Sequence, residues 1–283
     1  KTSVLYTLLF ALTMHYSPEQ LGVVLLDTRE TLFNYRGQRS LSELPHVLAA
    51  ESETAGIMQV VEHLEREGAA LKQGTSKRSV LVLIDNFDEF SEERELNDCV
   101  SRLASVARRY GREGIHIVLA GMFDGNVSND LRKRVQSSGY GIGLRTVQGL
   151  EPFRITKIPS SLQGQELTVG RGYMVRAGQL TQVQVASPYH QQAGVVDELT
   201  EETRIARLDW WVSQIVDRHQ TQRAAWSEPS AQPATAAVPE SAAVQHLRRI
   251  ARMALAYEQT QQREPSNPAL RSNLAAAGEG QFD

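Results

Sequence analysis

The chain has 283 residues, of which 41% are hydrophobic and 22% are charged, so it can bury a full core and add a smaller appendage. Its formal net charge of −3 provides no strong positive field, which argues weakly against nucleic-acid binding by this segment. A single cysteine, Cys99, excludes an internal disulfide framework, and no apolar run approaches the roughly 18 residues of a membrane span.

Apolar strands alternate with amphipathic helices in the first half of the chain. Apolar residues at helical spacing predict helices over residues 3–15, 54–71 and 93–110. Short apolar runs predict strands over residues 22–27, 79–85 and 115–121, the first two of them buried, and residues 140–145 are a fourth candidate strand. Because parallel strands need crossover connections, this alternation predicts an α/β fold with a mainly parallel sheet and helices on both faces.

The pattern changes after residue 150. Residues 170–186 predict a β-hairpin around an Ala-Gly turn, and residues 197–219 predict a polar amphipathic helix. Residues 226–242 are rich in Ala, Pro and Ser, which is typical of a linker that cannot bury a core. The predicted organisation is a core, a helical extension, this linker, and a short helix with a disordered tail, at residues 1–190, 191–225, 226–242 and 243–283.

The first two residues, Lys1 and Thr2, stand directly before an apolar helix, as the last residues of a phosphate-binding loop do. In such a loop, backbone N–H groups hold the phosphates, the lysine reaches the β and γ groups, and the hydroxyl binds Mg²⁺. A lysine-threonine pair at the start of a chain means little by itself. This interpretation therefore depends on the motifs that follow, and it expects the upstream part of the loop to be missing.

Residues 80–90, VLVLIDNFDEF, contain an apolar run that ends in an acid, the Walker B pattern. Asp85 would hold the water shell of Mg²⁺, although a buried strand ending in a capping acid is about as common. Asn86 follows, where ATPases usually carry the glutamate that polarises the attacking water, and an amide cannot accept that proton. The sequence therefore supports ATP binding better than hydrolysis, and it requires Lys1 and Asp85 to face each other across adjacent strand ends.

The strand predicted over residues 115–121 ends beside Met122, which offers no side-chain hydrogen bond where a polar sensor of the γ-phosphate would be expected. A basic cluster, Arg132, Lys133 and Arg134, could supply an arginine finger to a neighbouring subunit, but a solvated helix face explains it better. Other residues are expected to be structural rather than functional: His46, His116, Trp210 and Trp211.

These segments together resemble the FtsK/SpoIIIE family, which includes chromosome-pumping motors and the EccC-type ATPases of type VII secretion. The match includes an aspartate and a basic residue after the first strand, Asp27 and Arg29, and an LPHV segment at residues 44–47. It continues through GIHIVLA at residues 114–120 and a candidate sensor or finger arginine, Arg145. The resemblance covers about the first 190 residues and implies a RecA-like P-loop NTPase fold.

Within the family, the segment from GRGY to VQVA at residues 170–186 is similar to the later ATPase modules of EccC-like proteins, which often lose catalytic carboxylates. The resemblance implies an ATP- and Mg²⁺-binding module of a protein-secretion ATPase with weakened hydrolysis. It also implies sister modules or subunits in a hexameric ring, a secreted protein as substrate, and an upstream anchor at the cytoplasmic face of a bacterial membrane. Two alternatives remain open: an active DNA-translocating ATPase and an assembly scaffold that binds no nucleotide.

Overall fold

The computed structural model describes residues 1–122, 129–144, 167–189 and 200–227. The chain divides into two compact units, Lys1–Ser241 and Ala242–Asp283, and the second lies outside the described residues. The helix and tail predicted after residue 242 therefore have no structural counterpart to compare. No helix within the described ranges combines the length and the apolar character needed to cross a membrane.

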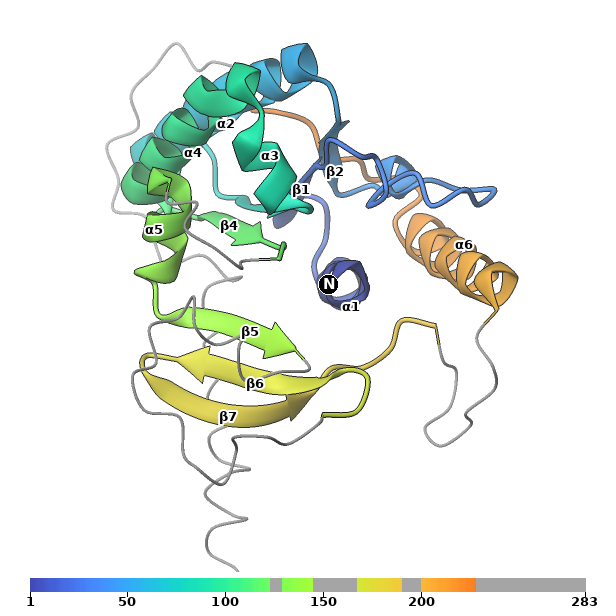
Figure 1. Cartoon of the computed structure of the whole chain (residues 1–283). Helices are drawn as coiled ribbons and strands as arrows, with labels where there is room; N and C mark the ends of the chain where they lie inside the picture. Colours follow the sequence, from blue (N-terminus) through green and yellow to red (C-terminus); the bar gives the residue numbers. More distant parts are fainter. Residues whose placement is uncertain (123–128, 145–166, 190–199, 228–283) are drawn as a thin grey trace, which may run out of the picture. The chain divides into compact units, whose positions relative to one another are not determined.

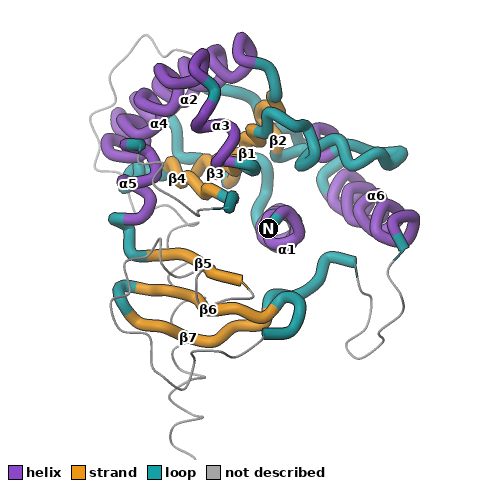
Figure 2. Tube along the Cα trace, viewed as in Figure 1, coloured by secondary structure: helices purple, strands orange, loops and turns teal. Residues whose placement is uncertain are grey.

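The larger of two sheets is parallel and four-stranded, with the strand order β2-β1-β3-β4 (Figure 2). Its strands are β1 (Leu21–Leu26), β2 (Val47–Glu51), β3 (Ser79–Ile84) and β4 (Ile115–Leu119). Three of these strands match the apolar runs of the sequence. The sequence pattern missed β2, because this strand lies at the edge of the sheet and buries only Val47.

Six α-helices are formed by the described residues (Figure 1). They are α1 (Thr2–His15), α2 (Thr54–Gln73), α3 (Phe87–Glu92), α4 (Asn97–Tyr110), α5 (Asp130–Gln136) and α6 (Glu201–Arg218). Two short 3₁₀ turns, Leu41–Glu43 and Arg94–Leu96, complete the helical elements. The predicted helices at 3–15, 54–71 and 197–219 are present, whereas that at 93–110 begins as a 3₁₀ turn before α4.

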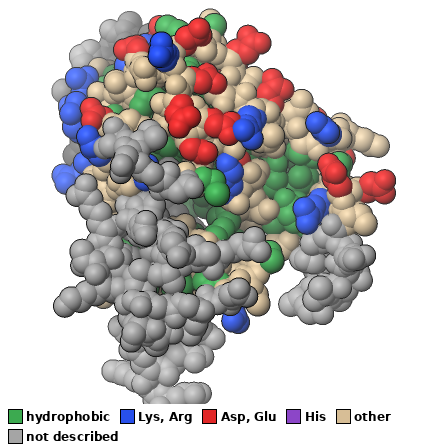
Figure 3. Space-filling view, viewed as in Figure 1, with side chains coloured by type: hydrophobic (Ala, Val, Ile, Leu, Met, Phe, Trp, Pro, Cys, Tyr) green, Lys and Arg blue, Asp and Glu red, His purple; other side chains and the backbone are tan. Residues whose placement is uncertain are grey.

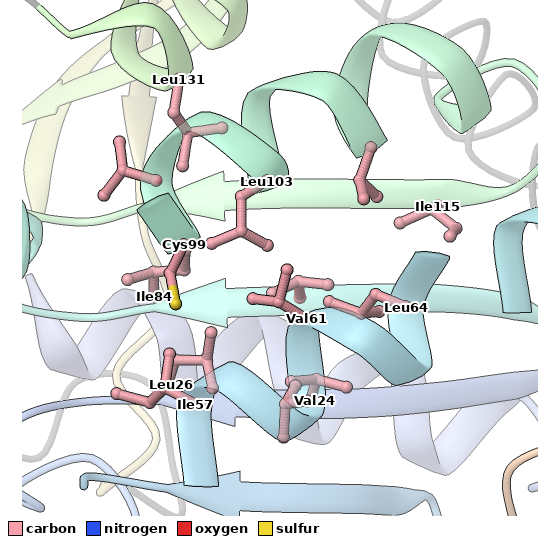
Figure 4. Packing of buried hydrophobic residues seen from close by; sticks show 14 of the residues in the cluster. Val24, Leu26, Ile57, Val61, Leu64, Ile84, Cys99, Leu103, Ile115 and Leu131 are labelled. Carbon is pink, nitrogen blue, oxygen red and sulfur yellow. The ribbon is translucent and has the colours of Figure 1, made fainter. Parts of the chain in front are cut away.

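Helices cover both faces of the parallel sheet, as predicted. On one face, alternate strand residues such as Val24 and Ile84 pack against α2 and α4, through side chains such as Val61 and Leu103 (Figure 4). Helix α1 lies on the opposite side of the sheet from α2 and α4 (Figure 1) and buries one side of its own surface, including Leu9. Because β1 and β3 are buried along their whole length, their sequences are continuous apolar runs.

The second sheet is antiparallel and three-stranded, in the order β5-β6-β7. Strands β6 (Arg171–Arg176) and β7 (Gln179–Gln184) form the predicted hairpin around the Ala-Gly turn, whose two residues both have positive φ. Strand β5 (Tyr140–Leu144) corrects an expectation, because it joins this sheet instead of the parallel one. Its alternating glycines leave it without the apolar side chains that a strand buried on both faces requires.

Candidate nucleotide site

The carboxyl ends of β1 and β3 bring three polar side chains together. Asp27 directly follows β1, and Asp85 and Asn86 directly follow β3, which is the neighbour of β1 in the sheet. The backbone ladder continues one residue further, since the Asp85 N–H donates to the Leu26 carbonyl. All three polar side chains are buried. Parallel pairing of two adjacent strands therefore creates a compact polar centre at this edge of an otherwise apolar sheet.

The first two residues of the chain lie against this centre. The Thr2 hydroxyl donates a 2.6 Å hydrogen bond to Asp85 Oδ2. The Lys1 ammonium lies 3.8 Å from Asp85 Oδ1 and also donates to the side-chain oxygen of Asn86. The tertiary structure thus brings together the four residues that the sequence singled out for phosphate and metal chemistry, across more than eighty residues of chain.

Asn86 connects the lysine to the neighbouring strand end. Its Nδ2 donates to Asp27 Oδ1 at 2.8 Å and to Thr31 Oγ1 at 3.3 Å, while its Oδ1 accepts from Lys1. Its backbone has a φ of 50° and a ψ of 41°, the left-handed conformation that asparagine tolerates better than most side chains. Both ends of the Asn86 amide are therefore committed to protein contacts.

Asp27 is a member of this centre whose contacts the sequence did not reveal. Its two carboxylate oxygens accept from Arg29 N, Thr31 Oγ1 and Leu32 N at 2.8–3.1 Å, in addition to the Asn86 amide. These donors come from the loop that directly follows β1, so the carboxylate also fixes the path of that loop. The sequence showed only an acid at the end of a buried strand; adjacency to Asp85 depends on the strand order.

The tip of β4 is occupied by a different acid. The Met122 side chain is 65% exposed, and its backbone N–H donates to Asp88 Oδ1 at 3.2 Å. A Cβ on Gly121 would lie 2.6 Å from the same oxygen, so glycine permits this close approach. The neighbouring acid, Glu89, forms an ion pair with Arg29. Both acids of the NFDEF segment are thus engaged away from the Lys1–Asp85 pair.

The remaining candidates lie outside the centre or outside the described residues. Arg145 belongs to the part of the chain that the structure does not describe. Lys133 and Arg134 are exposed on α5, as expected for a solvated helix face. Burial lowers the pKa of His46 to about 4 and lowers that of His116 as well. Within the described ranges, no group of three or more His, Cys, Asp or Glu side chains is arranged to hold a metal ion.

Comparison with known proteins relates the chain to secretion ATPases. No model of a known protein family matches. The chain is 30% identical to the ESX secretion system protein EccC of Thermomonospora curvata, in an alignment that covers 62% of this chain but only 15% of EccC.

Two solved structures share the fold. ATPases 2 and 3 of EssC from Geobacillus thermodenitrificans match with a TM-score of 0.58 and 16% identity, covering 82% of this chain and 45% of that one. ATPases 2 and 3 of Thermomonospora curvata EccC, solved with a signal sequence peptide, match with a TM-score of 0.52 and 20% identity, covering 84% and 43%. The chain is therefore similar in sequence to a part of EccC, a type VII secretion protein, and it shares the fold of EssC and EccC ATPase domains.

Proposed function

We propose that this chain is an ATP-binding module of a type VII secretion ATPase, in which Lys1 contacts the phosphates and Thr2 and Asp85 hold Mg²⁺. The hydrogen bond between the Thr2 hydroxyl and the buried Asp85 carboxylate carries the proposal. It places an alcohol oxygen and a carboxylate oxygen together at the start of a helix, beside a lysine ammonium. Hard oxygen ligands of this kind suit Mg²⁺, and the helix N-terminus suits phosphate, so the residues present fit both groups.

We further propose that hydrolysis by this module is slow or absent. Asn86 stands where a glutamate would polarise water, and its amide is bonded to Lys1 and Asp27. The nearby carboxylates offer no simple replacement, because Asp88 accepts from the β4 tip and Glu89 pairs with Arg29. Bound nucleotide would then stabilise an interface with a sister module instead of driving turnover.

The proposed setting is the cytoplasmic face of a bacterial membrane, in a ring of sister modules anchored by another part of the protein. The sequence relationship is to a secretion protein, and a structural relative was solved with a signal sequence peptide, so we propose a secreted protein as substrate. The face drawn in Figure 3 carries both acidic and basic side chains, and the formal net charge of −3 provides no strong positive field for the alternative of DNA translocation.

The test uses protein that also carries the native residues preceding Lys1. Binding of a fluorescent ATP analogue is titrated with Mg²⁺ for the wild type, for Lys1→Ala, and for Lys133→Ala as a control on the exposed face of α5. We expect Lys1→Ala to weaken binding about a hundredfold, which is about 2.7 kcal/mol, and Lys133→Ala to leave it unchanged. Equal affinity in all three proteins would refute the proposal and favour a scaffold that binds no nucleotide.

Hydrolysis is measured separately, by phosphate release from the wild type and from Asp85→Ala under the same conditions. Indistinguishable rates are expected if Asn86 leaves the module without a general base. A wild-type rate that clearly exceeds the Asp85→Ala background would contradict the proposed loss of hydrolysis without affecting the proposed binding.

A further inference from the structure

The chain that follows β7 lies along the proposed phosphate-binding helix. The Thr7 hydroxyl donates to the Ala186 carbonyl at 2.8 Å, and the Ser3 hydroxyl lies 3.2 Å from the Tyr189 hydroxyl. Ser3 and Thr7 are four residues apart and so share one face of α1. Residues 186–189 therefore run along this face toward the first turn of the helix.

Helix α6 fixes the same segment from its other side. The Trp211 indole N–H donates to the Pro188 carbonyl at 2.9 Å, and the Trp211 ring stacks on Phe10 of α1 at 5.6 Å. The Arg204 guanidinium lies over the Tyr189 ring, 5.7 Å from its centre. Tyr189 is thus held in place by two helices that are far apart in sequence, and it is only partly buried.

The positions of Thr2 and Ser3 relate the lysine end of the proposed site to Tyr189. In a phosphate-binding loop the lysine reaches the β and γ phosphates, and the loop's backbone N–H groups cradle the α and β phosphates. Here the lysine end is marked by Asp85 and Asn86, which Thr2 and Lys1 contact. Ser3 is the next residue around the helix, about 100° away, and it faces Tyr189. A nucleotide whose α-phosphate and nucleoside extend from the lysine end toward Ser3 would meet Tyr189.

We propose that Tyr189 packs against the nucleoside of the bound nucleotide and is the aromatic side wall of the site. The inference rests on the proposed nucleotide binding and adds a residue that no motif in the sequence indicated. Arg204 lies over one face of the ring, and in this arrangement the base or ribose would pack on the opposite face. Because every base has an aromatic face, such a contact adds affinity without strong preference for one base.

The experiment compares ATP with inorganic tripolyphosphate, which has the phosphates but no nucleoside. Affinities are measured for wild type, Tyr189→Ala, Tyr189→Trp and the control Tyr140→Ala, an exposed tyrosine on β5, all with the native residues before Lys1. Tyr189→Ala is expected to weaken ATP and GTP binding about tenfold, or about 1.4 kcal/mol. Tripolyphosphate binding should be unchanged, Tyr189→Trp should retain ATP affinity, and Tyr140→Ala should behave as wild type.

Three other outcomes would overturn the inference. An unchanged ATP affinity in Tyr189→Ala, with the loss in Lys1→Ala retained, would remove Tyr189 from the site and leave the proposed function intact. An equal loss for ATP and tripolyphosphate would mean that Tyr189 only supports the fold around α1, and Tyr189→Leu would then be expected to restore both. Absence of binding of either ligand by the wild type would refute the proposed function and this inference together.

Discussion

The two edges of the parallel sheet both bury charged groups, but they satisfy them differently. At the amino-terminal edge, Glu67 of α2 accepts from the Ser76 hydroxyl at 2.8 Å and from the Ser227 N–H and hydroxyl at 3.0 Å each. The Arg78 guanidinium lies 3.5 Å from the same carboxylate. Residues just before β3 and just after α6 therefore surround this acid with donors.

The chain after α6 closes that edge along its length. The His219 ring meets the His46 ring edge-on at 4.8 Å, the Ala224 N–H donates to the Pro45 carbonyl, and Trp226 stacks on His63 at 5.1 Å. These contacts join the residues before β2, and His63 of α2, to a segment that lies 163 to 179 residues later in the chain. The segment after α6 therefore covers the amino-terminal edge of the sheet, and the charged groups there have a structural role.

At the carboxyl-terminal edge, Asp85 takes its side-chain donor from the start of α1, which is also where a phosphate-binding helix would present its ligands. A buried carboxylate by itself therefore does not identify a functional site. The distinction lies in its hydrogen-bond partners. A structural carboxylate is satisfied by donors that the fold keeps in place, whereas the partners of a functional carboxylate could also bind a metal ion or a phosphate.

The largest effect is expected at the amino-terminal edge. Glu67→Ala removes the buried acceptor of Ser76 and Ser227 and the carboxylate beside the largely buried Arg78 side chain, so it should lower the free energy of unfolding by about 4 kcal/mol. Urea denaturation measures the change, with Glu62→Ala on the exposed side of α2 as the control. ATP affinity of the fraction that remains folded should not change. Loss of ATP affinity with little loss of stability would contradict the structural role inferred for the amino-terminal edge.

His46 extends the comparison to pH. Burial lowers its pKa from an ordinary value of 6.5 to about 4, so the unfolded chain binds more protons than the folded one between these values. The contribution of neutral His46 to the free energy of unfolding is therefore complete above pH 6.5. It is lost as the pH falls toward 4, by a total of about 3 kcal/mol. Thermal unfolding at a series of pH values measures it.

The control for this pH dependence is His46→Gln, whose amide can still donate to the Tyr16 carbonyl that His46 contacts. The slope of stability against pH should become shallower in the variant. It should not vanish, since burial also lowers the pKa of His116. An identical slope in the two proteins would remove His46 from the explanation.

At the carboxyl-terminal edge, Asp85→Ala should have the opposite profile to Glu67→Ala. We expect the affinity for Mg²⁺·ATP to fall about a hundredfold, which is about 2.7 kcal/mol, with a smaller change in the free energy of unfolding. Titrations with Mg²⁺ and with EDTA should converge in the variant but differ in the wild type. A persisting Mg²⁺ dependence would show that Asp85 does not hold the ion.

Asn86→Glu tests whether the substitution at this position is a simple catalytic loss. The new side chain must adopt a left-handed backbone and would place a carboxylate beside Asp27 and Asp85, so stability should fall by about 2 kcal/mol. Phosphate release should not rise. The matched control, Asn97→Glu at an exposed position with right-handed helical backbone, should be nearly neutral. Rapid ATP hydrolysis by Asn86→Glu would show that Asn86 alone accounts for the loss of hydrolysis.

The smallest effect is expected at the surface. Glu65 lies two residues before Glu67 on α2 and forms an ion pair with Arg102 of α4. Both side chains of this pair are partly exposed. Because water screens such pairs, a double-mutant cycle of Glu65→Ala and Arg102→Ala should give a coupling of about 0.5 kcal/mol. A coupling energy near the loss of about 4 kcal/mol expected for Glu67→Ala would contradict the inferred difference between this exposed ion pair and the buried Glu67 carboxylate.

The sequence by itself determined the local elements and the acids at their ends. Continuous apolar runs identify β1, β3 and β4 because strands buried on both faces need apolar side chains at every position. The edge strand β2 escaped this signal since most of its residues are only partly buried, and β5 was assigned to the wrong sheet because its pairing depends on a distant hairpin. Resemblance pointed to a family, and the comparisons show similarity to EccC in sequence and to EssC in fold.

Only the tertiary structure decided which polar residues meet. Strand order places Asp27 beside Asn86, and packing of α1 beneath the sheet brings Thr2 to Asp85. A hydrogen bond joins Ser227 to Glu67, which are 160 residues apart in the chain, and another joins Tyr189 to Ser3, which are 186 residues apart. Local sequence patterns encode secondary structure and burial, whereas such contacts arise from the collective packing of elements, which no short segment specifies.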